Sequence, residues 1–165
     1  MARISSAATA HITKLLSGPN GANRNLENLR SAAQQNVLDP GPLQIRAQNA
    51  IADLAEHGEA ARYPMAMVYC EKVVNSMIEK FRTFSGTVQM TVEVRHSQDR
   101  LDGLQDGLEL CAEAVAQVLD SNRGNWGVGM YYAGGYQVAF GGVKRGGLNY
   151  LQVAKINFEI GVSIS

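Results

Sequence analysis

Strict alternation of apolar and polar residues over Thr87–Arg95 constrains the fold of this chain more than any other feature. Successive side chains of a β-strand point to opposite faces, so this pattern predicts a strand with one face on a hydrophobic core. The apolar positions that would share the core face are Val88, Met90, Val92 and Val94. The same alternation runs from Ile156 to Ile164, and it predicts a long final strand that begins as early as Tyr150.

A long helix is predicted between these two strands. Ser97 or Asp99 is expected to cap it, and its apolar residues recur every three or four positions up to Val118. One side of the helix would therefore face the sheet, through Leu101, Leu104, Leu108, Cys111, Val115 and Val118.

Proline and glycine separate a helical first part from a sheet-rich last part. All four prolines lie within the first 64 residues, where helical spacing predicts a helix over 4–16 and a second over 26–33, capped by Asn23 or Asn25. For residues 43–62 both strand and helix stay open. The apolar run Met65–Val74 predicts a buried strand. Residues 126–132 and 136–140 are predicted to form a hairpin around Gly134 and Gly135, and 141–147 a wider turn.

These elements predict an α+β fold, namely a mainly antiparallel sheet flanked by helices, with one long helix packed on the sheet. The predicted organisation is an N-terminal helical region over 1–62 and an α+β core domain over 63–165, together expected to form one compact domain. A chain of 165 residues buries a core without disulfides or metals. Cys70 and Cys111 form no CxxC pair and are interpreted as buried apolar side chains.

Composition disfavours several classes of function. Fifteen basic residues balance fifteen acidic ones, whereas a dedicated nucleic-acid-binding domain or a polybasic membrane anchor usually carries a basic excess. No apolar stretch is long enough to span a bilayer, so we expect no membrane partner.

No combination of residues predicts an active site. The three histidines (His11, His57 and His96) lack metal-ligand spacing, and no G-x-S-x-G motif is present. The glycine-rich stretch GGVKRGG lacks the GK[ST] ending of a phosphate-binding loop and leads into a strand. His96 as a catalytic base is the minor alternative to a surface or strand-end histidine. The sequence therefore predicts a protein that is not an enzyme and needs no cofactor or metal.

Two charged features are candidate interaction surfaces. Acidic residues recur every three or four positions along one side of the predicted long helix: Asp99, Asp102, Asp106, Glu109 and Glu113. They form either a solvated face or a deliberately negative surface, for example one that lines a channel for an anionic polymer. Lys144 and Arg145 are either exposed cations on a strand connector or contacts for a partner subunit or polyanion.

The order of several segments resembles a known family. These are LLSGPNG, then FSG leading into TVQMTVEVRHSQDR, then GMYYAGGYQVAFGGVKRGGLNY and the closing QVAKINFEIGVSI. Over about residues 63–165 this order resembles the tail-terminator and neck (head–tail joining) proteins of long-tailed bacteriophages.

The resemblance implies a structural virion protein, assembled in the host cytoplasm as a hexameric ring. Such a ring caps the tail tube and joins it to the head connector, with DNA passing without sequence specificity through the lumen. Asp99, Asp102 and Asp106 would then be candidates for the lumen or a subunit interface, and Lys144 and Arg145 for contact with the tube or a neighbour. We infer these placements from charge and exposure, since no family motif carries them.

Other functions stay open. The same features fit another head–tail adaptor or completion protein, or a tail-tube protein. A different class is a small-molecule-binding domain with an aromatic pocket of Trp126, Tyr131, Tyr132 and Tyr136, although packing on a strand face is the more common role for such residues.

Overall fold

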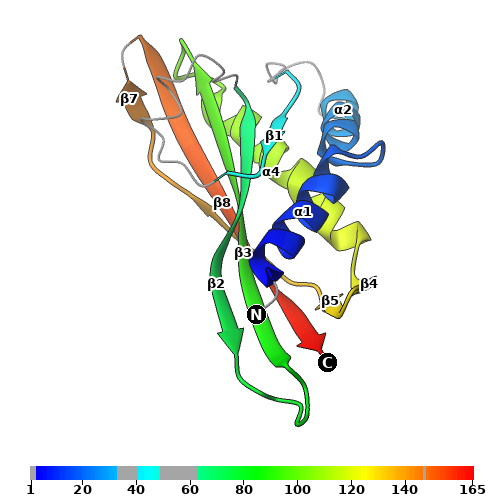
Figure 1. Cartoon of the computed structure of the whole chain (residues 1–165). Coiled ribbons are helices and arrows are strands. Elements are labelled where there is room, and N and C mark those ends of the chain that lie inside the picture. Colours follow the sequence, from blue (N-terminus) through cyan, green and yellow to red (C-terminus); the bar gives the residue numbers. More distant parts are fainter. Residues whose placement is uncertain (1–2, 33–40, 49–62, 147) are drawn as a thin grey trace.

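The computed structural model describes residues 3–32, 41–48, 63–146 and 148–165 (Figure 1). Its helices are α1 (Ile4–Ser17), α2 (Ala22–Ala32) and α4 (Leu104–Ser121). Its strands are β1 (Gln44–Arg46), β2 (Met65–Asn75), β3 (Phe84–Gln98), β4 (Gly124–Gly127), β5 (Met130–Tyr132), β6 (Gln137–Phe140), β7 (Lys144–Gly146) and β8 (Asn149–Ile164). The predicted α+β class, with a mainly antiparallel sheet and helices packed on it, is confirmed.

Two long strands, β3 and β8, form the centre of the sheet. They pair antiparallel along their whole length, from Phe84 opposite Ile164 to Gln98 opposite Tyr150. β2 pairs antiparallel with the other side of β3, and the short β1 pairs parallel with β2. The strands predicted from the two alternating segments and from the apolar run at Met65 are all confirmed.

Three short strands follow one another along the outer side of β8. β7 pairs with the beginning of β8, β6 with its middle and β5 with its end, while β4 lies beyond β5. The predicted hairpin between 126–132 and 136–140 is therefore wrong. The chain already reverses between β4 and β5, where Gly127, Val128 and Gly129 all have positive φ. Gly134 and Gly135 connect β5 to β6, and these two strands pair with different stretches of β8 rather than with each other. The predicted wide turn contains β7.

The long helix begins later than predicted. β3 stays extended through Ser97 because it keeps pairing with β8, and Gly103, with a φ of 80°, precedes the first turn of α4. Neither Ser97 nor Asp99 caps the helix. Leu101 lies before α4 and is 57% exposed, whereas the other five predicted apolar positions are buried as expected.

Helix α2 begins before both of its predicted caps. Asn23 and Asn25 therefore lie inside the helix, and their side chains hold neighbouring backbone. Asn23 exchanges two hydrogen bonds with Leu43 (2.7 and 3.1 Å), and Asn25 Nδ2 donates to the carbonyl of Ala114 in α4 (3.1 Å). Within the undecided stretch 43–62, residues 44–46 form a strand and 49–62 lie outside the described residues.

The main core lies between the helices and one face of the sheet. Apolar residues of α1, α2 and α4 join those of β2, β3 and β8 in a single buried cluster. The alternating residues Val88, Met90, Val92 and Val94 of β3 are almost fully buried there, opposite Ala154, Ile156, Phe158 and Ile160 of β8. The division of the chain at residue 62 stays a prediction.

Candidate functional site

The five residues predicted as interface candidates all lie on the surface, near one end of the sheet. Tyr150 pairs with Gln98 on one side and with Arg145 on the other, so the loop that carries Asp99 and Asp102 and the strand β7 share this end. Among the described residues, none of the ion pairs joins the acidic group to the basic one. Their roles stay predictions.

Local contacts fix the positions of these charges. Gln98 Nε2 donates to the carbonyls of Arg100 (2.8 Å) and Asp102 (2.7 Å), which shapes the loop before α4. Asp106 lies in the first turn of α4, where the helix dipole favours a carboxylate. The guanidinium of Arg145 lies 5.6 Å from the centre of the Tyr150 ring.

The acidic side of α4 runs beside strand β6. Gln152 Nε2 donates both to Gln105 Oε1 of α4 (3.2 Å) and to the carbonyl of Gly141, which follows β6 (2.9 Å). Gln105 in turn donates to Glu109 Oε1 (3.1 Å), one helical turn further along. At the other end, the hydroxyl of Tyr136 donates to Asp120 Oδ2 (3.3 Å).

Exposed apolar side chains of β6 adjoin this row of acids. Val138 and Phe140 pair with Ile156 and Ala154, so they lie on the sheet face that α4 packs against, yet they are 36% and 42% exposed. Glu109 and Glu113 are exposed, and the carboxylate of Glu113 contributes to the raised pKa of Tyr136, after burial and Asp120. We call Glu109, Glu113, Val138 and Phe140 the α4–β6 face.

The loop between β2 and β3 carries a second exposed apolar group. Met77, Ile78 and Phe81 are 48%, 72% and 100% exposed, and we call these three residues the hairpin tip. Figure 1 shows this loop extending past the helices, at the opposite end of the molecule from β7. Sequence reasoning missed it, although apolar residues interleaved with Glu79, Lys80 and Arg82 in a turn were a visible signal.

Hydrogen bonds hold the hairpin tip in one conformation. Asn75 Oδ1 accepts from the backbone N–H groups of Met77 (3.3 Å) and Ser85 (3.1 Å), and the Ser85 hydroxyl accepts from the N–H of Glu79 (2.9 Å). The Glu79 carboxylate pairs with Arg82 at 3.1 Å and accepts from the Ser163 hydroxyl at 2.9 Å. The tip is thus fastened to the end of β8, and Met77 and Phe81 adopt positive φ values of 49° and 67°.

The sheet face opposite the helices contains a buried polar cluster. Glu93 accepts hydrogen bonds from Arg95 Nε (2.6 Å) and the Tyr69 hydroxyl (3.2 Å), and Lys155 Nζ lies 3.8 Å from it. The side chains of Glu93 and Arg95 are only 9% and 3% exposed. Burial, followed by the Glu93 charge, raises the pKa of Tyr69, which therefore stays a neutral donor.

The aromatic residues of the pocket hypothesis do not converge on one cavity. Trp126 stacks on His11 (4.6 Å between ring centres) and contacts Tyr132, which packs edge-on against Phe158 in the core. Tyr132 is fully buried, whereas Tyr131 is 54% exposed. Packing is therefore the role of Trp126 and Tyr132.

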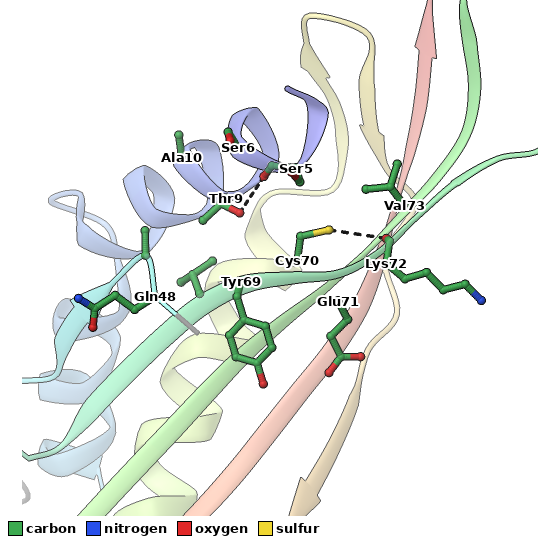
Figure 2. A pocket seen from close by; sticks show the side chains of 12 residues that line it. Ser5, Ser6, Thr9, Ala10, Gln48, Tyr69, Cys70, Glu71, Lys72 and Val73 are labelled. Carbon is green, nitrogen blue, oxygen red and sulfur yellow. Dashed lines mark hydrogen bonds between the residues drawn. The ribbon is translucent and has the colours of Figure 1, made fainter. Parts of the chain in front are cut away.

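A cavity of about 590 Å³ lies between α1 and β2 (Figure 2). Ser5, Ser6 and Thr9 of α1 line one side, and a bulge between Cys70 and Lys72 shapes the other. The Thr9 hydroxyl donates to the carbonyl of Ser5 (2.7 Å), and Cys70 Sγ to that of Lys72 (3.6 Å). Burial raises the pKa of Cys70, so its sulfur is a thiol rather than a nucleophilic thiolate.

Two histidines are shielded from water, His96 almost completely and His11 in part. His96 was expected at a strand end or on the surface, and both expectations are wrong. β3 continues past it to Gln98, and His96 is only 5% exposed, opposite Gln152 in β8. Burial lowers its pKa, an effect only partly offset by a hydrogen bond with Gln98. Burial and, to a lesser degree, Lys14 lower the pKa of His11.

These shifts predict that acid destabilises the fold. The unfolded chain binds protons near the ordinary histidine pKa of 6.5, whereas the folded chain binds them only at lower pH. The free energy of unfolding is therefore expected to be steady above about pH 7 and to fall as the pH drops through 6.5 towards the lowered values. Urea unfolding at pH 7.5 and 5.5 measures this loss. H96Q should show a smaller loss than the wild type, and an equal loss would contradict the assignment.

Comparisons with known proteins add no relative. No family model and no curated protein matches the chain. Within the described residues, no group of three or more histidine, cysteine, aspartate or glutamate side chains could hold a metal ion. In the same part of the chain, no helix has both the length and the apolar character needed to cross a membrane.

Proposed function

We propose that this chain is a structural, non-catalytic subunit of a phage neck, a tail terminator that forms a ring on the tail tube and joins it to the head connector. The observation that carries the proposal is the pair of exposed apolar surfaces, the hairpin tip and the α4–β6 face, on a subunit whose helices and sheet otherwise share a continuous core. Exposed apolar groups of this kind are typical of sites for protein–protein contact.

The edges of the sheet support the same proposal. In the part of the chain that the structure describes, no strand pairs with the outer edge of β6 or β7. Unpaired strand edges offer backbone N–H and C=O groups to another chain, and a repeated contact between unlike surfaces closes into a ring when its rotation permits. In a virion these edges would be covered by neighbouring subunits.

The charged end of the sheet supplies the proposed contacts of the ring. Asp99, Asp102 and Asp106 would line the lumen or a subunit interface, where carboxylates repel DNA phosphates and let the polymer slide. Lys144 and Arg145, on the exposed β7, would contact the tail tube or a neighbour. Six copies, the tube protein and the connector are the partners of this proposal. A head–tail adaptor, a completion protein or a tube protein would use the same surfaces with different partners.

Deletion of the gene from a phage that encodes this chain tests the proposed role. Without a terminator, lysates viewed by negative-stain electron microscopy should contain separate heads and unattached tails of irregular length. The gene supplied in trans should restore joined particles, and immunogold labelling of restored virions should mark the neck. Normal joined virions from the deletion strain would overturn the proposal.

A further inference from the structure

The hairpin tip has the properties of an interaction anchor. Its three apolar side chains are presented to solvent by a loop that the Asn75, Ser85, Glu79 and Arg82 contacts hold in place. A preorganised loop loses little conformational freedom on binding, so more of the burial energy appears as affinity. Lys80, beside Phe81, adds an exposed cation, whereas Arg82 is already paired with Glu79.

The α4–β6 face complements the tip in both polarity and charge. Val138 and Phe140 are apolar and lie on an open edge strand, and the adjoining Glu109 and Glu113 are exposed carboxylates. An apolar tip that carries Lys80 fits an apolar strip bordered by acids. Within one chain the two surfaces cannot meet, because β8 separates the tip at Ile164 from the β6 partner Asn157 by roughly 24 Å of strand.

We propose that the hairpin tip of one copy docks on the α4–β6 face of a second copy, so that the chain associates head to tail. Each copy then uses the tip once and the face once, which is the arrangement that extends into rings. This contact would join neighbouring subunits of the proposed neck ring. The inference rests on the proposed function in one respect, namely that copies of the chain associate with one another.

The size of the tip predicts how this association behaves. An aromatic side chain buries about 150–250 Å², so three side chains fall short of the roughly 800 Å² per partner typical of a stable complex. A single contact should therefore be weak. Closure, in which every copy makes two contacts, should favour complete rings over short chains as concentration rises.

Sedimentation velocity of the full-length chain over a range of concentrations tests the contact. The wild type should form larger species, and the tip variant I78S/F81N should associate about 30-fold more weakly. The face variant V138K/F140K should behave in the same way. Both variants change exposed side chains, and circular dichroism checks that they fold. V128S removes a 79% exposed apolar side chain between β4 and β5, outside both surfaces and the charged loop, and should associate like the wild type.

Mixing the two variants separates head-to-tail docking from other arrangements. The intact tip of the face variant and the intact face of the tip variant form one productive contact, so an equimolar mixture should yield heterodimers and nothing larger. Contact between two tips would instead let the face variant, whose tip is intact, dimerise by itself, and the mixture would contain no heterodimers. Charge reversal adds a second readout: K80E should weaken association by about tenfold, and adding E109K/E113K should restore it.

Three results would overturn the inference: a wild type that stays monomeric at every concentration, a tip variant that associates normally, or a mixture without heterodimers. These results are independent of the deletion phenotype. A joined, normal virion from the deletion strain defeats the neck function whatever the chain does in solution, whereas intact association of I78S/F81N defeats only the assigned contact.

Discussion

Replacing Arg95 with methionine is expected to lower the free energy of unfolding by about 3–5 kcal/mol. Arg95 gives the buried carboxylate of Glu93 a guanidinium at hydrogen-bond distance, and both side chains are almost completely shielded from water. Methionine fills similar space but, among the described residues, leaves Glu93 with the Tyr69 hydroxyl and the half-exposed Lys155 as its partners. Thermal unfolding should show a loss of roughly 6 to 20 °C in Tm, at 2–4 °C per kcal/mol for a chain of this size.

A double variant distinguishes a lost ion pair from lost packing. E93Q/R95M removes the buried charge along with its partner and should recover a large part of the stability lost in R95M, since the penalty comes from an uncompensated carboxylate. Lys155→Met is a milder control, because its side chain is 50% exposed and the distance to Glu93 is long. A double variant no more stable than R95M would contradict the electrostatic explanation.

Alanine in place of Gly86 is expected to cost about 3 kcal/mol, at the upper end of overpacking penalties. Gly86 lies in β3 opposite Asn75, and an added Cβ would collide with the carbonyl oxygen of Val74 in the paired strand. Backbone cannot rotate away as a side chain can, so the β2–β3 pairing next to the hairpin tip must shift. Equilibrium urea unfolding measures the loss.

Gly161 is the matched control for this substitution. It lies in β8 opposite Thr87, the residue after Gly86, and an added Cβ would make only an ordinary contact of 3.6 Å with the carbonyl of Tyr131. G161A should be neutral or gain up to about 1 kcal/mol, because alanine loses less conformational freedom in a strand. Equal losses in G86A and G161A would show that the close approach to Val74 is not the cause.

The sequence was sufficient to predict the central strands and the buried side of α4. Alternation in β3 and β8 and the three-to-four spacing of Leu104–Val118 depend only on the geometry of a strand and of a helix. The sequence was less informative about the residues at which elements begin and about which strands pair. The start of α4 depends on Ser97 staying in the ladder with Leu151, and β6 pairs with β8 rather than with its neighbour β5. Both are tertiary contacts between distant residues.

The candidate surfaces were predicted only in part. Alternation shows which side chains of β3 share a face, but it does not show that the polar face is buried, so the Glu93–Arg95 pair was missed. The acidic row on α4 was visible in the sequence, whereas its position beside Val138 and Phe140 depends on the Gln105–Gln152–Gly141 hydrogen bonds. The hairpin tip has no periodicity, and only its exposure makes it stand out.

The single strand β8 makes the outer half of the sheet modular. β7, β6 and β5 each bind a different stretch of it, so a change of length in the connectors at 133–136 or 141–143 alters one module and leaves the others in place. A one-residue insertion within β8 has the opposite effect, because it turns every later side chain to the other face. Evolutionary length variation in proteins built on this plan should therefore collect in those connectors, while β8 keeps its length.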